Sequence, residues 1–208
     1  MTTTNVDLTT VINDRHSIRV YDPSVKIDKN ELNDMIQEAA KAPSAWNLQH
    51  WKFLVVDDPD LQNTLLPIAF NQQQVVDASA VIAILGDLEA NKNAERVYSE
   101  AVAAGFMTEE AKSTLIGQIN GAYQSPEAAL HSAILNPSLA AMQLMLIAKA
   151  RGYDTCSMAG YDSAQFIKTF NIPSRYVPVM LLTIGKKAKD AHATNRFPVE
   201  DITLYNNF

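Results

Sequence analysis

The stretch AVIAIL, residues 80–85, is an uninterrupted apolar run that ends at Gly86 and Asp87. Apolar residues at both alternating positions are typical of a strand that is buried on both faces. The runs WKFLVV (51–56) and VPVMLLTI (177–184) predict two further strands, one before and one after it in the chain. Helical patterns lie between these strands, so the sequence predicts helices packed on a sheet, of the α/β or α+β class. Periodicity does not give the strand order.

Helical patterns fill most of the remaining chain. Residues 8–12 carry apolar side chains at helical spacing and predict a short helix. Asp28 begins a capping-box-like start, and the helix that follows should end before Pro43. Residues 126–151 predict a long helix that is apolar around much of its circumference, in which Pro137 is expected to make a kink or to start a new helix.

Residues 89–120 are polar, and their helical pattern is weak. We expect two helices broken near Gly105, with Thr108 capping the second, and we interpret the segment as an insertion or a lid over a site. Asp162 is expected to cap a short helix over 163–170. The whole chain, 1–208, is predicted to be one domain with this helical excursion.

The composition excludes several classes of protein. A net charge of −6 over 208 residues argues against non-specific nucleic-acid binding, which needs a surplus of Lys and Arg. The single cysteine, Cys156, excludes an intramolecular disulfide and indicates a reducing compartment. The amino terminus resembles no secretory signal, and the apolar stretch 140–150 is too short to span a bilayer. We therefore expect a soluble, cytoplasmic protein with no nucleic-acid or membrane partner.

Sequence motifs for several chemistries are missing. No GxGxxG or P-loop pattern occurs, the histidines show no zinc-ligand spacing, and there is no GxSxG motif. No metal is predicted. A lone cysteine is more often a small buried apolar residue than a nucleophile. The chemistry must therefore come from another kind of site.

A local basic cluster, RHSIRVYD (15–22), stands out in this acidic chain. Arg15, Ser17 and Arg19 suit a phosphate or a planar polar ring, because guanidinium groups donate paired hydrogen bonds to anionic oxygens. A solvated charged turn explains the same spacing equally well.

Two loops offer further candidates. APSAWNLQHW (42–51) places amide side chains, which both donate and accept hydrogen bonds, between a helix and a strand. This suits a flavin or nucleobase edge, although Trp46 and Trp51 could equally pack in the core of an ordinary loop. GYDTCSMAGYD (152–162) has small residues that allow a backbone to approach a flat ligand, and a glycine-bounded turn is the alternative.

Taken together, these motifs resemble one family. RHSIRVYD, APSAWNLQHW, FNQQQVVDAS (70–79), CSMAGYD, a late strand ending in IGK and a terminal NRFP occur in the order and spacing of the FMN-dependent nitroreductases. The resemblance extends over residues 8–204. It implies an α+β fold with a central, mostly antiparallel sheet flanked by helices, and a homodimer with long interface helices and two FMN sites.

The resemblance also implies roles for individual residues. Arg15 and Ser17 match positions that serve the FMN phosphate and ribityl chain, Arg19 lies near the pyrimidine edge, and Arg196 also holds the phosphate. Ser157 to Gly160 match a backbone segment beside the isoalloxazine ring. The full set of implied cofactor-binding residues is Arg15, His16, Ser17, Arg19, Pro43, Ser44, Ala45, Asn47, Gln49, Asn71, Gln74, Ser157, Met158, Ala159, Gly160 and Arg196. Those from Pro43 to Asn47 match a loop that reaches the flavin of the other subunit.

Three positions depart from the family pattern. Gln74 and Thr194 stand where many relatives carry a basic residue, and Ala159 stands where many have Glu. These differences bear on the redox potential and on the preferred nicotinamide.

The implied reaction is a ping-pong transfer of two electrons. Hydride would pass from NAD(P)H to flavin N5, and a nitroaromatic or quinone would then take the electrons in the same pocket, so no side-chain nucleophile is needed. The alternatives are a flavin-holding or sensing protein with little turnover, and a family variant with another flavin-dependent reduction such as ene reduction.

Overall fold

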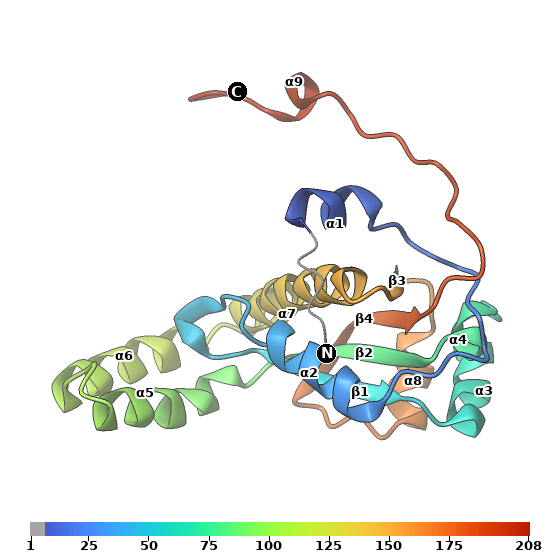
Figure 1. The fold of residues 1–208 in the computed structure, drawn as a ribbon. Coiled ribbons are helices and arrows are strands. Elements are labelled where there is room, and N and C mark those ends of the chain that lie inside the picture. Colours follow the sequence, from blue (N-terminus) through green and yellow to red (C-terminus); the bar gives the residue numbers. More distant parts are fainter. Residues whose placement is uncertain (1–6) are drawn as a thin grey trace.

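The computed structural model describes residues 7–208, and its centre is a four-stranded antiparallel sheet (Figure 1). The order is β1-β2-β4-β3. The strands are β1 (Trp51–Val56), β2 (Ala80–Asp87), β3 (Asp154–Met158) and β4 (Tyr176–Gly185). The antiparallel sheet confirms the α+β class. Most of the amino-terminal segment that we expected to carry no secretory signal lies outside the described residues.

β2 is the inner strand that the AVIAIL run predicts. All eight of its residues are buried. It pairs with β1 from Trp51↔Gly86 to Val56↔Val81, and with β4 from Ala80↔Ile184 onward. Successive side chains of a strand point to opposite faces of the sheet. Val81 therefore belongs to the core cluster on one face, and Ile82 belongs to the cluster on the other.

Helices cover both faces of the sheet (Figure 1). One core cluster packs side chains of α3 and α8 on the sheet, and the other packs those of α2 and α7. The helices are α1 (Leu8–Asp14), α2 (Lys29–Ala39), η1 (Ala45–Asn47), α3 (Pro59–Ile68), α4 (Gln74–Asp77), η2 (Ala90–Asn93), α5 (Ala94–Ala103), α6 (Glu109–Ala122), α7 (Pro126–Ala150), α8 (Ser163–Thr169) and α9 (Val199–Ile202).

The predicted caps are confirmed. The Asp28 carboxylate accepts from the amides of Asn30 and Glu31, Thr108 Oγ1 accepts from Ala111, and Asp162 accepts from Gln165. Each satisfies an amide of the first helical turn that has no partner within the helix.

Two expectations were incomplete. α7 is one helix of 25 residues that contains Pro137, so the proline does not start a new helix. Residues 154–158, which we read as part of a loop or turn, form β3. The sequence DTCSM carries no apolar run, and this edge strand is held by its pairing with β4 from Asp154↔Gly185 to Met158↔Leu181.

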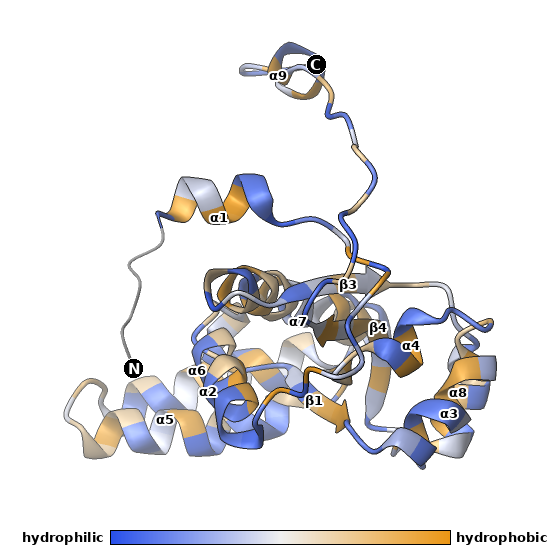
Figure 2. Cartoon of the chain, turned by 45° about the vertical axis from the view of Figure 1, so that its right-hand side comes forward, coloured by the Kyte–Doolittle hydropathy of each residue, from blue (hydrophilic) through white to orange (hydrophobic). Residues whose placement is uncertain are grey.

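α7 has two apolar faces. One packs inside the chain and includes Ala133, Ala140 and Leu144. The other is exposed, with side chains 40–50% accessible: Leu130, Ile134, Leu135, Leu139 and Met142. α1 and the carboxyl-terminal segment add further exposed apolar residues, and Figure 2 shows apolar positions on α1 and α9, which stand clear of the sheet.

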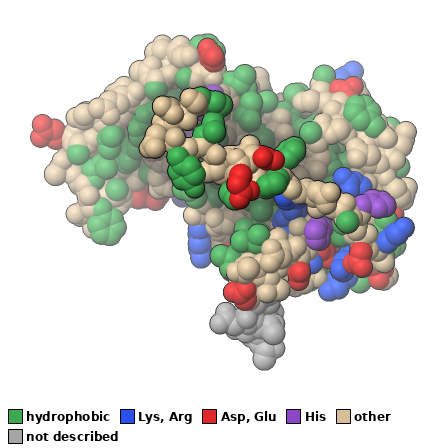
Figure 3. Space-filling model, turned by 90° about the horizontal axis from the view of Figure 1, so that it is seen from above, with side chains coloured by type: hydrophobic (Ala, Val, Ile, Leu, Met, Phe, Trp, Pro, Cys, Tyr) green, Lys and Arg blue, Asp and Glu red, His purple; other side chains and the backbone are tan. Residues whose placement is uncertain are grey.

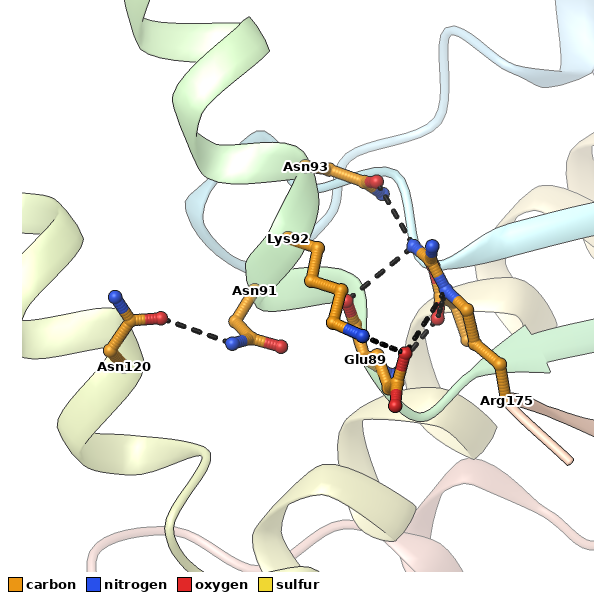
Figure 4. Close-up of polar contacts among 7 residues, drawn as sticks. Glu89, Asn91, Lys92, Asn93, Asn120 and Arg175 are labelled. Atoms are coloured by element: carbon orange, nitrogen blue, oxygen red, sulfur yellow. Dashed lines mark hydrogen bonds and ion pairs between the residues drawn. The ribbon is translucent and has the colours of Figure 1, made fainter.

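The two helices predicted within 89–120 are confirmed as α5 and α6, and this excursion projects beyond the sheet (Figure 1). A polar cluster joins its base to the sheet (Figure 4). Arg175 donates two hydrogen bonds to the buried Asp87 carboxylate, at 2.7 and 2.6 Å, and a third to Asn93 at the base of α5. The Asn91 amide donates to Asn120 of α6. The excursion is therefore attached through side chains as well as through the chain itself.

His50 is fully buried beside this cluster, and its backbone carbonyl accepts from Asp87. Burial lowers the pKa of His50 from 6.5 to about 4, although the Asp87 charge opposes the shift. A histidine with a depressed folded-state pKa favours folding above the unfolded pKa and loses that contribution as pH falls through 6.5 towards 4.

We therefore expect stability to fall by about 2 kcal/mol between pH 8 and pH 5 through His50 alone. Urea unfolding of the His50→Leu variant should show a correspondingly flatter pH dependence. An unchanged profile in His50→Leu would show that another group causes the acid sensitivity.

Candidate functional site

The basic cluster leaves α1 and runs along the free edge of β3. Ser17 forms a parallel bridge with Thr155, and the Ile18 amide donates to the Thr155 carbonyl at 3.0 Å. Tyr21 anchors the segment in the core, where its hydroxyl lies 2.9 Å from Thr183 Oγ1. Burial raises the pKa of Tyr21 above its ordinary value, so this hydroxyl keeps its proton.

The charges of this segment are available to a ligand. Among residues 7–208, Arg15 and Arg19 form no ion pair with a carboxylate. Arg15 and Ser17 are half-buried, whereas His16 and Arg19 are exposed. Arg19 donates only to the Ser17 carbonyl, at 3.4 Å. Figure 3 shows Lys, Arg and His side chains gathered on one side of the face seen from above.

Cys156 lies beneath this segment and is 2% exposed. Burial raises the pKa of its thiol, against the opposing effects of Arg19 and Ser17. A protonated, buried thiol fits the prediction that Cys156 is a small core residue and not a nucleophile.

The carboxyl end of β3 continues into the second predicted segment. Ser157, Ala159 and Gly160 are exposed, whereas the Met158 side chain is 4% exposed and belongs to the core. Met158 can therefore offer a ligand only its backbone. With the basic cluster on the adjoining edge, polar side chains and free backbone share one end of the sheet.

The turn after α3 contributes Asn71 and Gln74. Asn71 is exposed and Gln74 is buried at the start of α4. Phe70 and Asn71 have φ values of 55° and 56°, in the left-handed region that bulky residues rarely adopt. Strain of this kind persists only where surrounding contacts hold it, and it is frequent at ligand sites.

The loop 43–49 is equally strained but lies elsewhere. Trp46, Asn47 and Gln49 have φ values of 53°, 55° and 51°. The loop is held by α7 and α5, since the Ala45 amide donates to Asn136 and the Tyr98 hydroxyl donates to the Trp46 carbonyl. In Figure 1 the segment between α2 and β1 lies towards the excursion, away from β3 and α4.

Its predicted residues Pro43, Ser44, Ala45, Asn47 and Gln49 thus do not join the first group within one chain. Ser44 is half-buried, and its hydroxyl accepts from the Gln49 amide, whereas the other four are exposed. A groove of about 610 Å³ lies beside this loop, between α2, β1 and α5, and Gln49 and Lys52 form part of its lining.

Arg196 lies in the segment after β4, which runs away from the sheet and past α1 (Figure 1). Among residues 7–208, its hydrogen bonds go only to Thr194 and Asn195. Within one chain, Arg196 is therefore separate from Arg15. Another arrangement of the tail, or the tail of a second chain, would be needed to bring Arg196 and Arg15 to the same phosphate.

The assembled group can bind an anionic, planar molecule. Within residues 7–208, two guanidinium groups without a carboxylate partner and a serine hydroxyl supply donors for phosphate, while amide side chains and the exposed backbone of Ser157, Ala159 and Gly160 supply donors and acceptors for a polar ring edge. Thr155 adds a buried hydroxyl that has no partner among the described residues. This donor set fits FMN.

Two contributors escaped the sequence analysis. Thr155 gave no signal because it lies in an unrecognised strand. Gln72 stands in the FNQQQ stretch between two residues that we did select, but three consecutive glutamines look alike in sequence. Only the folded turn shows that Gln72 is the one whose side chain donates a hydrogen bond to the Gly160 carbonyl.

Comparison with known proteins identifies the family of the chain. A model of the nitroreductase family matches residues 12–186. Bacillus subtilis YodC, provisionally named an NAD(P)H nitroreductase, is 54% identical over 195 residues, covering 94% of this chain and 96% of that protein. A CLA biosynthesis enone reductase of Lactiplantibacillus plantarum is 39% identical over 204 residues, covering 96% of this chain and 94% of that protein. A crystal structure from Exiguobacterium sibiricum, described as a provisional nitroreductase in complex with FMN, has a TM-score of 0.91 and 41% identity, covering 99% and 100% of the two chains.

Proposed function

The chain belongs to the nitroreductase family, and from this premise we propose that it is an FMN-dependent oxidoreductase that uses NAD(P)H to reduce nitroaromatic or quinone-type acceptors. The observation that carries the proposal is the meeting of three distant segments at one end of the sheet. Ser17 adjoins Thr155, and the Asn71–Gln74 turn adjoins Gly160. These are the segments to which the family resemblance assigns the cofactor.

The described residues divide the work of holding FMN. Arg15 and Ser17 would bind the phosphate and ribityl end through charge-assisted hydrogen bonds, and Arg196 would join them from the tail. Asn71, Gln74 and the backbone of 157–160 would meet the ring. When bound, FMN supplies the redox chemistry by accepting two electrons from NAD(P)H and passing them to the acceptor.

The protein contributes orientation and electrostatics. The Arg19 guanidinium is fixed only weakly, through the Ser17 carbonyl, and is free to turn towards the ring edge. A cation there stabilises negative charge on the reduced ring and so favours reduction. Gln74 is neutral where many relatives carry a cation, so Arg19 would provide much of this charge.

We infer a homodimer in which each site uses both chains. The exposed face of α7 lies opposite its packed face and is too apolar to remain in water. A twofold partner would cover α7, α1 and the tail, and would bring its 43–49 loop to the flavin. By length and composition α7 could also cross a membrane, with 39% of the relevant window buried. Its packing on the sheet favours the dimer, and we propose a cytoplasmic location.

A second acceptor class has a specific basis. A relative with 39% identity is named an enone reductase, so an activated carbon–carbon double bond is an alternative acceptor. The excursion α5–α6 would shape the acceptor pocket, and it carries no chemistry of its own that would select between the two.

The deciding experiment uses the purified wild-type protein. We expect a yellow protein that binds FMN and consumes NADH or NADPH only when an acceptor is present. Menadione, a nitrofuran and an enone fatty acid form the acceptor panel. Tight FMN binding without turnover on any of them would favour a flavin-holding protein, and absence of FMN binding would refute the proposal.

Two arginine variants test the proposed roles. Arg15→Ala should raise the dissociation constant of FMN about tenfold or more, because it loses charge-assisted hydrogen bonds to the phosphate. Arg19→Ala should instead make the midpoint potential of the bound flavin more negative. Fluorescence titration and dye-coupled potentiometry measure the two effects. Arg96, paired only with Glu100 on the surface of α5, gives the control Arg96→Ala, which should change neither.

A full flavin complement in Arg15→Ala would remove the phosphate role. An unchanged potential in flavin-loaded Arg19→Ala would remove the electrostatic one.

A further inference from the structure

The side chain of Gln72 joins two segments that lie far apart in sequence. Its Nε2 donates to the Gly160 carbonyl at 2.7 Å and to the Ala69 carbonyl at 3.0 Å. Its Oε1 accepts from Gln74 Nε2 at 3.3 Å. Both amide hydrogens and the amide oxygen are therefore engaged, which fixes the orientation of the group.

The contacts of Gln72 lie next to two residues with left-handed backbone conformation. Phe70 and Asn71, both in the left-handed region, connect the end of α3 to Gln72. By binding the Ala69 carbonyl on one side of this pair, the Gln72 amide closes the turn on itself. A phenylalanine at φ 55° is strained, so the turn depends on contacts of this kind.

Gly160 receives the other hydrogen bond at the end of the exposed backbone segment after β3. A Cβ added to Gly160 would lie 3.4 Å from Gln72 Nε2, at van der Waals contact, so the Gln72 amide packs closely on Gly160. A separate backbone bond, from the Asp162 amide to the Ile68 carbonyl at 2.8 Å, already ties the same two regions together. Loss of Gln72 should thus loosen the local geometry without separating α3 from α8.

We propose that Gln72 is a positioning residue of the cofactor site, whose amide fixes the Asn71–Gln74 turn against the Gly160 carbonyl so that both segments form one wall for the flavin ring. The inference rests on the proposed FMN site. Gln72 itself has no free polar group for the flavin, since each is used within the protein, and it acts through Gly160 and Gln74.

The chain offers a matched control one residue away. Gln73 lies in the same turn, and its Nε2 donates only to Asp77 Oδ1, at 2.9 Å on the surface. Gln72→Ala and Gln73→Ala remove the same atoms from neighbouring positions. Gln72→Glu keeps the size of the side chain but replaces the donor with an oxygen that would face two carbonyl oxygens.

We expect Gln72→Ala to raise the dissociation constant of FMN about tenfold, which corresponds to about 1.4 kcal/mol, and Gln72→Glu to raise it at least as much. Gln73→Ala should stay within twofold of wild type. At saturating FMN, both Gln72 variants should also shift the midpoint potential and the visible absorption bands of the flavin, which a general loss of stability would not do. Thermal unfolding of the FMN-free proteins measures the structural effect separately.

The inference is overturned if Gln72→Ala binds FMN as wild type does, or if Gln72→Glu does, because the donor would then be dispensable. It is also overturned if Gln73→Ala weakens binding equally, or if Gln72→Ala lowers only the melting temperature. If the wild-type protein itself binds no FMN, the proposed function fails, and the Gln72 inference fails with it.

Discussion

The Leu135→Glu variant should be a folded monomer that has lost most of its affinity for FMN. Leu135 is 50% exposed within one chain and lies on the unpacked face of α7. In a twofold dimer each substitution occurs twice, and each would bury a carboxylate without a partner at a cost of several kcal/mol. Because each site is proposed to need the partner's 43–49 loop, we expect the dissociation constant of FMN to rise about 100-fold or more, equivalent to about 2.7 kcal/mol.

Light scattering after size exclusion gives the mass, circular dichroism the folded state, and fluorescence titration the affinity. Leu61, 47% exposed on α3, provides the matched control, and Leu61→Glu should remain a dimer with full affinity. A dimeric Leu135→Glu would show that this face is not the interface. A monomer that retains full affinity would show that one chain suffices for the site.

The Gly86→Ala variant should be severely destabilised. Gly86 lies in β2 where α7 crosses the sheet, and an added Cβ would overlap the Ala133 carbonyl oxygen and lie 2.7 Å from its carbon. These are backbone atoms of a packed helix, which cannot rotate away as a flexible side chain can. Since α7 must move as a whole or β2 must bend, we expect a loss of at least about 3 kcal/mol in the free energy of unfolding.

Urea unfolding measures this loss, with Gly117→Ala as the control. Gly117 lies in α6, and among residues 7–208 no atom beyond its chain neighbours and its own helix backbone lies within 4 Å of the position of an added Cβ. Alanine there should leave stability unchanged or raise it by up to about 1 kcal/mol, because alanine is the better helix former. If Gly86→Ala unfolds within about 1 kcal/mol of wild type, α7 is not held as closely on β2 as the structure indicates.

Among the described residues, five of the seven non-glycine positions with positive φ lie in the two loops proposed for the flavin. Trp46, Asn47 and Gln49 lie in one proposed flavin loop, and Phe70 and Asn71 lie in the other. None of these is a glycine, so each left-handed residue costs free energy that contacts such as Asn136 with Ala45 and Gln72 with Ala69 must offset. Left-handed backbone is thus concentrated in the two loops that we propose to bind the cofactor, while Asn171 and Asn206 adopt it elsewhere.

Local sequence determined much of this protein. The inner strand follows from the apolar run at 80–85, and the starts of α2, α6 and α8 follow from Asp28, Thr108 and Asp162. These features depend on the spacing of apolar residues along the chain and on side chains that cap amides a few residues away. A short window of sequence therefore contains all the necessary information.

The tertiary structure alone decided the rest. β3 has no apolar run and exists because β4 pairs with it, and Ser17 reaches Thr155 only through that strand. Gln72, and not its neighbour Gln73, meets Gly160 because the left-handed turn directs its side chain there. These pairs are separated by 138 and 88 residues in the chain. Contacts over such separations depend on how the whole chain packs. The residues that make such a contact therefore carry no local sequence pattern that predicts it.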